Sequence, residues 1–420
     1  MKNPIRLLTM RSKYMPGFGD MLTGGTQLMG FVIPMMKAAA RGGKKLDTSR
    51  YATSFAEIDK EKEEILNRAN WLCDKIIVSP DELLYSYPKI LGPYYGPQWS
   101  IYSCVNLIAA LANISHIWPE TKGKCLSRME KLLVLLQSEQ LKRYDASEWG
   151  EDPIETLEGN KSHVTYLSIL AWGISLYRLA GGSDKYDDLY GRCCEAMNRR
   201  MLRHKDMNLL SFPNKPVFFP DMFAAIVALK NYSLLFDDRY EDTIRKYLDK
   251  VRQKWLNYKT GLIVAMLYGQ RKTGIRGCYV GMNNFWLTLI DDEFAFDQYS
   301  RMKRILYKKD KFAGIKEYTY KSPKIAFDPD AGPIIDGLSP SGTAFAIGSA
   351  TYFKDWDVRN SMLATADLVG GRVEGDRQLH YKLGEFALVG EATVLAMRTN
   401  FPEVKKKMSM YKDNKTSSLL

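Results

Sequence analysis

Apolar residues recur at intervals of three and four along most of the chain from about Thr53 onward. This spacing predicts α-helices, because it places the apolar side chains on one helix face. No stretch of alternating apolar and polar residues of comparable length competes with it. The predicted helices are 55–75, 101–117, 124–141, 164–179, 186–202, 222–235, 240–257, 282–290, 294–307, 341–353, 358–368 and 386–399. The pattern therefore predicts an all-α fold.

Short and long links alternate between these helices. Short links such as 181–188 and 236–242 suit the turn of a helical hairpin. The longer links hold most of the paired Gly, Pro, Trp, Tyr and Asp residues, and they are 85–99, 149–163, 211–221, 268–281 and 318–340. An α/α toroid, a barrel of about five to six helical hairpins, would gather them at one end as a lined cleft. An open superhelix is the alternative, but no consensus repeats at a fixed period.

The ends of the chain differ from its body. The 420 residues, 45% hydrophobic and 12% aromatic, are sufficient for one large domain, predicted over 51–402. A basic and apolar N-terminal extension, 1–50, precedes it, and a basic flexible tail, 403–420, follows. The net charge of +12 gathers at both ends and near 301–311. No basic segment is interleaved with aromatic residues and glycines, so no nucleic-acid partner is expected.

The N-terminal extension contains an apolar run, 21–40, that glycines and a proline interrupt. It is too short and too broken for a spanning helix of ~20 residues, and its late position argues against a secretory signal. We expect a cytoplasmic protein in which this segment packs on the body or on another copy in a homo-oligomer. Peripheral membrane contact through residues 1–45 is the open alternative.

Neither cysteines nor histidines form a recognisable metal motif. The six cysteines lack CxxC spacing and lie mostly in apolar helical contexts, so reduced core thiols are expected. The four histidines are scattered. We therefore expect no metal and no cofactor.

Three aspartates, Asp328, Asp330 and Asp336, fall in the short stretch FDPDAGPIIDG. A turn-rich loop that holds several carboxylates suggests a reaction site. The structural alternative is that Asp328 and Asp330 make Asx turns and Asp336 caps the next helix. Because proline restricts the residue before it to extended backbone, we expect Asp328 to face the cleft as a catalytic residue and Asp330 to brace the loop.

Other candidates lie in or beside the remaining long links. Acid–base chemistry on a hydroxylated ligand uses carboxyl, histidine or tyrosine groups over aromatic platforms, and Asp221, His163 and Tyr166 suit the catalytic roles. Asp221 could equally cap its helix, and His163 could be a core residue. The expected substrate-binding residues are Tyr95, Trp99, Tyr102, Trp149, Asn214, Arg276 and Asp336. Arg276 could clamp a carboxylate or phosphate, whereas Cys278 lacks an adjacent histidine.

Two segments, WGEDPIETLEGNKSHVTYLSILAWGISLY and LLSFPNKPVFFPDMFAAIVALKNY, resemble the linalool dehydratase/isomerase-type α/α-barrel proteins. That family has an Asp-Pro-Ile segment before a helix with catalytic histidine and tyrosine, and a Pro-Asn motif between two cysteines. The matching residues are Asp152, Pro153, Ile154, Asn160, Pro213 and Asn214. The cysteine positions fall at Ser211 and near Pro220, and the histidine position falls near Tyr166. The resemblance therefore implies the fold and not the thiol-based chemistry.

These patterns predict an acid–base enzyme of lyase, isomerase, epimerase or hydrolase type with a central aromatic cleft. Its expected substrate is a carbohydrate or another multi-hydroxyl or isoprenoid molecule. The competing hypothesis is a noncatalytic ligand-binding or membrane-associated scaffold with the same fold. A titrating carboxyl in a shielded pocket favours the enzyme, and aspartates used only as caps favour the scaffold.

Overall fold

A computed structural model describes residues 46–87, 92–320 and 325–411. The side chains of residues 92–95, 325 and 327 lie outside the description as well. The N-terminal extension up to residue 45 and the tail from residue 412 are outside the described residues. The described chain is mostly helical, as the apolar periodicity predicts, and it also contains three small sheets.

Each predicted helix is present. The helices that we call the central helices are α4 (Gly92–Ile117), α7 (Val164–Leu179), α9 (Phe219–Leu235), α11 (Gly277–Thr288), α13 (Pro340–Tyr352) and α15 (Leu388–Arg398). The outer helices are α2 (Lys62–Ile76), α5 (Lys122–Leu136), α8 (Asp187–Leu202), α10 (Glu241–Lys254), α12 (Asp292–Ile305) and α14 (Trp356–Gly370). The apolar segment 124–141 is divided between α5 and α6 (Glu139–Trp149), because Ser138 is extended. The additional helices are α3 (Pro80–Tyr85), α16 (Pro402–Ser409) and the 3₁₀ helices Phe55–Glu61, Pro119–Thr121 and Lys382–Glu385.

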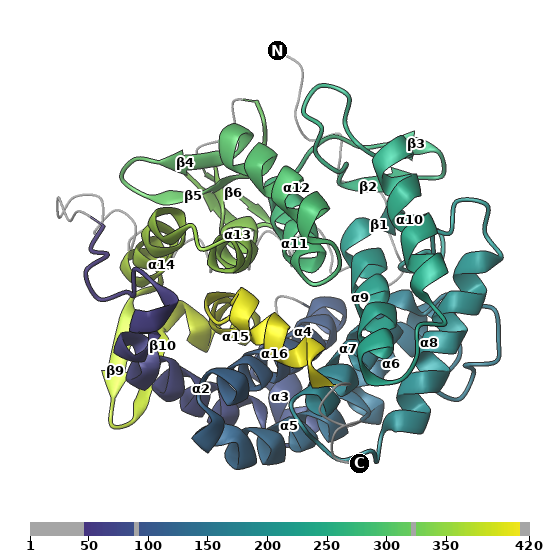
Figure 1. The fold of residues 1–420 in the computed structure, drawn as a ribbon, viewed down its shortest axis with the longest axis horizontal. Helices are drawn as coiled ribbons and strands as arrows, with labels where there is room; N and C mark the ends of the chain where they lie inside the picture. The colour runs from purple at the N-terminus through teal and green to yellow at the C-terminus, as the bar shows by residue number, and fades with distance from the viewer. Residues whose placement is uncertain (1–45, 88–91, 321–324, 412–420) are drawn as a thin grey trace.

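The central helices contact one another in a closed circuit. α4 contacts α7, α7 contacts α9, and the series continues through α11, α13 and α15 back to α4. Each outer helix packs against one or two central helices, and Figure 1 shows the central helices grouped within the others. α7 and α9 are buried on nearly all sides, whereas α10 buries one face. This difference is expected when some helices are surrounded by others.

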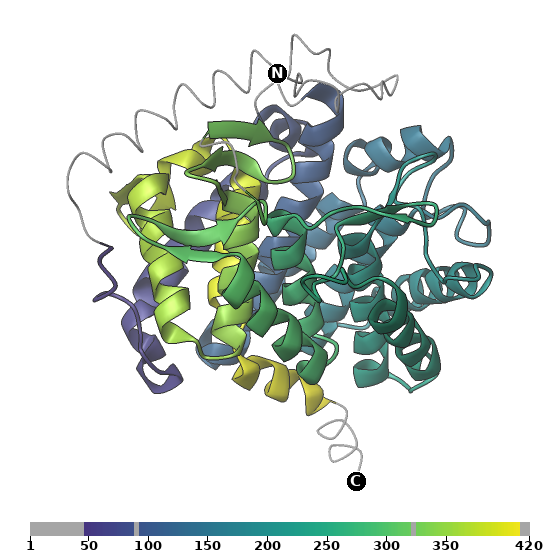
Figure 2. The same ribbon diagram turned by 90° about the horizontal axis from the view of Figure 1, so that it is seen from above.

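The central helices run in the same direction. Asn106 of α4 donates to Thr393 of α15 over 2.8 Å, and seven residues later Asn113 donates to Thr399 at the end of α15 over 3.2 Å. At the opposite end, Tyr102 of α4 reaches the first turn of α9. The described parts of the long links therefore lie at the N-terminal end of the central helices, and the first link, 85–99, is partly inside α4. Figure 2 shows the helices from the side.

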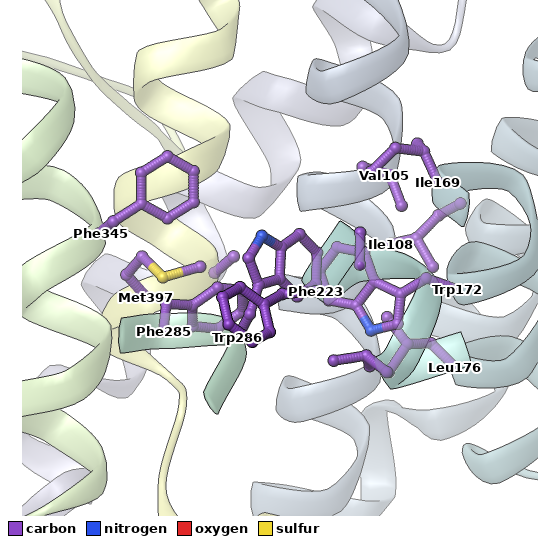
Figure 3. Packing of buried hydrophobic residues seen from close by; sticks show 14 of the residues in the cluster. Val105, Ile108, Ile169, Trp172, Leu176, Phe223, Phe285, Trp286, Phe345 and Met397 are labelled. Atoms are coloured by element: carbon purple, nitrogen blue, oxygen red, sulfur yellow. The ribbon is translucent and has the colours of Figure 1, made fainter. Parts of the chain in front are cut away.

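Aromatic side chains fill the space between the central helices. The ring centroids of Trp172 and Trp286 lie 4.6 Å apart, and those of Phe285 and Phe345 lie 5.9 Å apart. Figure 3 shows these side chains packed with Met397 and with aliphatic residues of α4 and α7. The interior below the N-terminal end is therefore a packed core.

Glycines allow α11 and α13 to approach closely. A Cβ atom at Gly281 would lie 2.5 Å from the carbonyl oxygen of Gly342, and one at Gly342 would lie 2.6 Å from that of Gly277. Since real Cβ atoms do not approach so closely, only glycine permits this backbone contact.

Small sheets accompany the mostly helical, all-α-like architecture that the sequence predicts. The five-stranded sheet has the order β4 (Tyr307–Lys309), β5 (Ala313–Lys316), β8 (Leu338–Ser339), β7 (Gly332–Ile335) and β6 (Ile325–Asp328). A three-stranded sheet joins β1 (Val217–Phe218), β2 (Met266–Tyr268) and β3 (Arg271–Lys272), and β9 (Arg372–Gly375) pairs with β10 (Gln378–Tyr381). Strands of two to four residues are too short to show a reliable alternating pattern.

A buried ionic network joins the first two described helices, Phe55–Glu61 and α2, to α14 and α15. Glu61 lies 2.8 Å from Arg359 of α14 and 2.7 Å from Arg398 of α15. Arg68 of α2 lies 2.5 Å from Glu391 of α15. All five side chains are almost fully buried, so their charges are stabilised by one another in place of water. Glu64 balances the third arginine charge by pairing with Arg68 and Arg398.

The region expected as a tail begins as a packed helix. Val404 and Met408 of α16 are buried, so residues 402–409 belong to the folded body. Among the described residues, the stretch Gly96–Ile117 of α4 is long and apolar enough to cross a membrane. Since 83% of its most apolar window is buried within the protein, it has the environment of a core helix.

Candidate functional site

Asp221 is the centre of a buried polar group at the N-terminal end of the central helices. It lies in the first turn of α9 and is 8% exposed. Its Oδ1 accepts a hydrogen bond from Tyr102 Oη of α4 over 3.2 Å, and its Oδ2 accepts one from Thr165 Oγ1 of α7 over 2.9 Å. Ser211 Oγ donates to the same Oδ2. Three segments thus converge on one carboxyl group.

Burial raises the pKa of Asp221, and the three hydroxyl groups oppose that rise only in part. Hydroxyl groups can donate to an ionised carboxylate or accept from a protonated one, so they accommodate both states. No described cation forms an ion pair with this carboxyl in the structure. A carboxyl that gains and loses a proton within a shielded group is suited to general acid–base chemistry. Helix capping, the structural alternative, would use backbone N–H donors, whereas the hydrogen bonds described here come from three hydroxyl groups.

His163 lies beside this group but has both ring nitrogens occupied. Nδ1 is 2.5 Å from Asp145 Oδ2 and Nε2 is 3.4 Å from Glu151 Oε1. His163 is fully buried and adopts φ 48° at the N-cap of α7. Burial raises the pKa of Asp145, and the hydrogen bond with His163 reduces the size of that rise. The arrangement joins α6 to α7 and supports a structural role for His163.

Three further expected site residues have other surroundings. Tyr166 is fully buried and donates to the carbonyl oxygen of Leu136 on the outer helix α5, over 2.8 Å, so its hydroxyl points away from Asp221. Trp149 packs on His163 with ring centroids 5.3 Å apart. Asn214 is exposed, with φ 57°, in the turn before β1. The structure does not bring these residues together with Asp221.

Among the aromatic residues expected to bind substrate, Tyr102 contacts Asp221 directly through its hydroxyl group. Trp99 is partly buried one turn earlier on α4, with its ring 6.3 Å from that of Tyr87. The side chain of Tyr95 lies outside the described residues. Tyr102 and Trp99 therefore remain the described candidates for contact with a ligand at this end.

Arg276 is at the centre of a second polar group, at the start of α11. Its Nε lies 2.6 Å from Glu317 Oε1, and its Nη2 lies 2.7 Å from Asp328 Oδ1. Asp330 Oδ2 is 3.8 Å from Nη1 and accepts a hydrogen bond from Tyr279 Oη over 2.7 Å. The Arg276 side chain is 18% exposed. Its positive charge is already matched by carboxylates of the chain, which leaves little to attract an acidic ligand.

The bracing role expected of Asp330 belongs to Asp328. Asp328 Oδ1 accepts hydrogen bonds from the backbone N–H groups of Asp330 and Ala331, over 2.9 and 3.0 Å, in an Asx turn. Asp328 therefore braces the turn between β6 and β7. Asp330 has a 48% exposed side chain, and its carboxyl accepts from the Tyr279 hydroxyl rather than from the backbone of its own turn. Proline at position 329 restricted the backbone of Asp328 but did not decide where its side chain points.

Asp336 does not belong to the same group. It lies in the turn between β7 and β8, at the other end of a four-residue strand, and pairs with Lys308 over 2.5 Å. It does not cap α13, because Ser339 Oγ performs that function by accepting from Gly342 N over 3.1 Å. The stretch expected as one loop is thus a β-hairpin and a second turn.

The cysteines and the other possible metal ligands form no comparable group in the described part of the chain. The six cysteines are buried and free, and burial raises the pKa of Cys278 well above its ordinary value. Among the described residues, no group of three histidine, cysteine or carboxylate side chains could hold a metal ion. A mostly apolar hollow of about 340 Å³ lies between the α2–α3 link, the start of α3 and α5, and Asp221 is not among its lining residues.

Sequence reasoning missed several members of these groups. Asp145 could have been found, because it shares the buried face of α6 with Leu141 and Tyr144, where a carboxyl group is unusual. Thr165 and Glu317 carry no such signal, since each meets its partner only in the folded chain. No protein-family model matches the chain, and no curated protein matches it at a significant level.

Proposed function

We propose that the chain is an α/α toroid of six helical hairpins that catalyses an acid–base reaction at the N-terminal end of its central helices. The toroid is supported by the closed circuit of contacts from α4 to α15 and by the outer helix that follows most central helices. α2, from the start of the described chain, completes the set by packing against α4 and α15.

The buried Asp221 carboxyl carries the functional part of the proposal. Its pKa is raised, and its partners are hydroxyl groups from three separate segments. In the protonated state Asp221 would donate a proton to a leaving group, and in the ionised state it would accept one from a substrate carbon or hydroxyl. Tyr102 Oη, the partly exposed member of the group, would bind the reacting oxygen or relay the proton.

The substrate that we infer is an uncharged carbohydrate or another multi-hydroxyl or isoprenoid molecule. Arg276, the residue best suited to an acidic group, is held by Glu317 and Asp328. The reaction class is a lyase, isomerase, epimerase or hydrolase. The resemblance to linalool dehydratase/isomerase-type proteins agrees with a site around Asp221. Ser211 occupies the position of one of that family's catalytic cysteines, and its hydroxyl donates to the Asp221 carboxyl.

A noncatalytic scaffold is the second candidate. It is favoured by the aromatic packing of Trp172, Trp286 and Phe285, which fills the interior below the site. In this proposal the protein is cytoplasmic, with self-association or peripheral membrane contact through residues 1–45.

The carboxyl group can be tested without knowing the substrate. Infrared difference spectra of the full chain, recorded across pH, would show the C=O band of a protonated carboxyl that Asp221→Asn removes. We expect this band to persist above the ordinary pKa of aspartate, 3.8. If the band disappears at that ordinary value, Asp221 is not a tuned acid and the proposal is wrong.

Catalysis is tested by incubation in D₂O with neutral sugars, a uronic acid and an isoprenoid alcohol, followed by NMR. We expect conversion or deuterium incorporation for an uncharged compound, loss of that activity in Asp221→Asn and a large reduction in Tyr102→Phe. Asp336→Asn is the matched control, because that carboxyl is exposed and remote from the site. Binding without conversion in the wild-type protein would favour the scaffold.

A further inference from the structure

Large apolar side chains are exposed at the N-terminal end of the central helices. They lie in or beside the links that lead into these helices: Tyr85 before α4, Leu210 before α9, Tyr268 before α11, Tyr320 before α13 and Phe386 before α15. Leu202 and Tyr258 are exposed at the ends of the outer helices α8 and α10, which lead into the same links. Exposed apolar side chains gathered on one side of a protein mark a surface that meets a partner or a membrane.

Three of the segments that carry these side chains meet at Asp206. Its carboxylate pairs with Lys254 of α10 over 2.7 Å and accepts from Gln270, in the turn between β2 and β3, over 3.0 Å. Lys250 of α10 donates to the carbonyl oxygen of Lys205 over 3.0 Å. The end of α8, the end of α10 and the β2–β3 hairpin thus form one continuous surface, and Figure 1 shows β3 next to α10.

This surface is basic as well as aromatic. We call it the basic face and define it by the exposed side chains Arg203, Lys205, Tyr258, Lys259, Tyr268, Arg271 and Lys272. No carboxylate in the described part of the chain forms an ion pair with its arginine and lysine side chains, and Asp206 is already paired with Lys254. A group of unpaired positive charges attracts a negatively charged partner.

Each tyrosine of the basic face has a cation beside it. Lys259 Nζ lies 5.6 Å from the centroid of the Tyr258 ring, and Arg271 is opposite Tyr268 on the neighbouring strand. The two tyrosines are 88% and 47% exposed. Tyrosine rings favour the level of the lipid headgroups, and long basic side chains reach the headgroup charges from the same depth. The pairing of these side chains therefore suits the surface of a bilayer.

We propose that the basic face docks on a membrane surface rich in anionic lipid. Its lysines and arginines would contact the headgroups, while Tyr258 and Tyr268 would insert their rings among them. Leu202 and Leu210, which are 55% and 42% exposed, lie in the adjoining segments and add apolar area. A nucleic acid fits this surface less well, because single-strand binders stack bases on aromatic rings along a groove and leucine offers no stacking surface.

The basic face borders the group around Asp221. β2, which ends at Tyr268, pairs with β1, and β1 ends three residues before Asp221. Leu210 precedes Ser211, whose hydroxyl donates to Asp221. Docking would therefore hold the Asp221 group close to the lipid, where the isoprenoid members of the inferred substrate class dissolve. Only this consequence rests on the proposed function, since the docking itself depends on the side chains of the basic face.

Co-sedimentation of the full chain with vesicles tests the docking. We expect binding to vesicles of mixed phosphatidylcholine and phosphatidylserine, little binding to pure phosphatidylcholine, and a decrease as salt screens the charges. Each basic side chain near an anionic surface strengthens binding roughly fivefold. Replacing both Arg271 and Lys272 by glutamine should therefore weaken binding to the mixed vesicles by at least about tenfold.

The matched control replaces both Lys406 and Lys407 by glutamine. It removes the same charge from α16 at the opposite end of the central helices, where Lys407 donates to the carbonyl oxygen of His116 near the end of α4. This control should retain most of the vesicle binding. Circular dichroism checks that both double variants are folded, and the N-terminal extension is present in both, so its own attraction to lipid cancels in the comparison.

The proposal is overturned if the protein does not bind the mixed vesicles, or if both double variants lose binding equally, which would show that net charge alone is responsible. It is also overturned if the loss of Arg271 and Lys272 leaves vesicle binding intact but abolishes binding of a single-stranded oligonucleotide, measured by fluorescence anisotropy. None of these measurements involves turnover, so the docking and the catalytic role of Asp221 can fail separately.

Discussion

The indole rings of Trp172 and Trp286 meet edge to face, with an interplanar angle of 76°. Trp172 belongs to α7 and Trp286 to α11, which are separated by α9 in the circuit of central helices. The pair therefore joins the two helices through the interior. Edge-to-face aromatic contacts add to the large apolar area that each tryptophan buries.

Replacement of Trp286 by alanine should lower the free energy of unfolding by about 3–5 kcal/mol, because it leaves a large cavity between the central helices. Urea unfolding followed by circular dichroism measures the loss. Tyr258→Ala is the control, since Tyr258 is 88% exposed and should change stability little. Similar losses in both variants would contradict the packed interior.

The contact between α11 and α13 can be tested at a glycine. Gly281→Ala places a Cβ atom against the carbonyl oxygen of Gly342 and should be strongly destabilising in thermal unfolding. Gly390→Ala in α15 is the matched control, because no atom lies within 4 Å of its added Cβ. The control should gain roughly 0.5–1 kcal/mol, as expected for alanine in place of glycine in a helix. Equal tolerance of both changes would rule out the close approach.

Asn283 on α11 is buried, and neither its amide nitrogen nor its amide oxygen has a hydrogen-bond partner among the residues that the structure describes. Asn283→Leu should therefore raise the melting temperature, since it removes a desolvation cost of about 1–3 kcal/mol. The neighbouring Asn284, with its amide suitably oriented, donates to Ala295 O over 3.0 Å and accepts from Tyr299 N over 3.2 Å. Asn284→Leu should lower the melting temperature. Destabilisation in both variants would show that Asn283 has a partner after all.

The ionic network predicts a loss of stability in acid. Although burial opposes ionisation, Arg359 and Arg398 lower the pKa of Glu61 from 4.5 to about 2. The folded protein thus binds this proton less tightly than the unfolded chain, so the stabilisation is complete above pH 4.5 and is lost as pH falls toward 2. Chemical unfolding at a series of pH values should show this decline, and Glu61→Gln should flatten it.

Glu61→Gln should also cost about 3–5 kcal/mol at neutral pH, because it leaves buried arginine charges incompletely paired. Glu57→Gln is the control on the same 3₁₀ helix, where the side chain is exposed and pairs with Lys60. An unchanged acid profile in Glu61→Gln would assign the decline to other carboxylates.

Local pattern was sufficient to identify the six central and six outer helices, but it missed the short helices α3 and α16. Helix α7 has the predicted bounds 164–179, since apolar periodicity within one segment determines which residues can be buried. The β6–β7 hairpin could not be found in this way. Its strands of four residues contain Pro333 and Gly332, and they are stabilised by pairing with each other and with the rest of the sheet.

The sequence alone identified Asp221 and Arg276 as candidates but left their environments open. Tertiary structure decided that Asp221 is buried among hydroxyl groups, because Tyr102 and Thr165 reach it from 119 and 56 residues away. It also decided that Arg276 is paired with Glu317, 41 residues along the chain. A carboxyl or guanidinium group acquires its pKa and its role from such distant neighbours, and a linear pattern does not specify them.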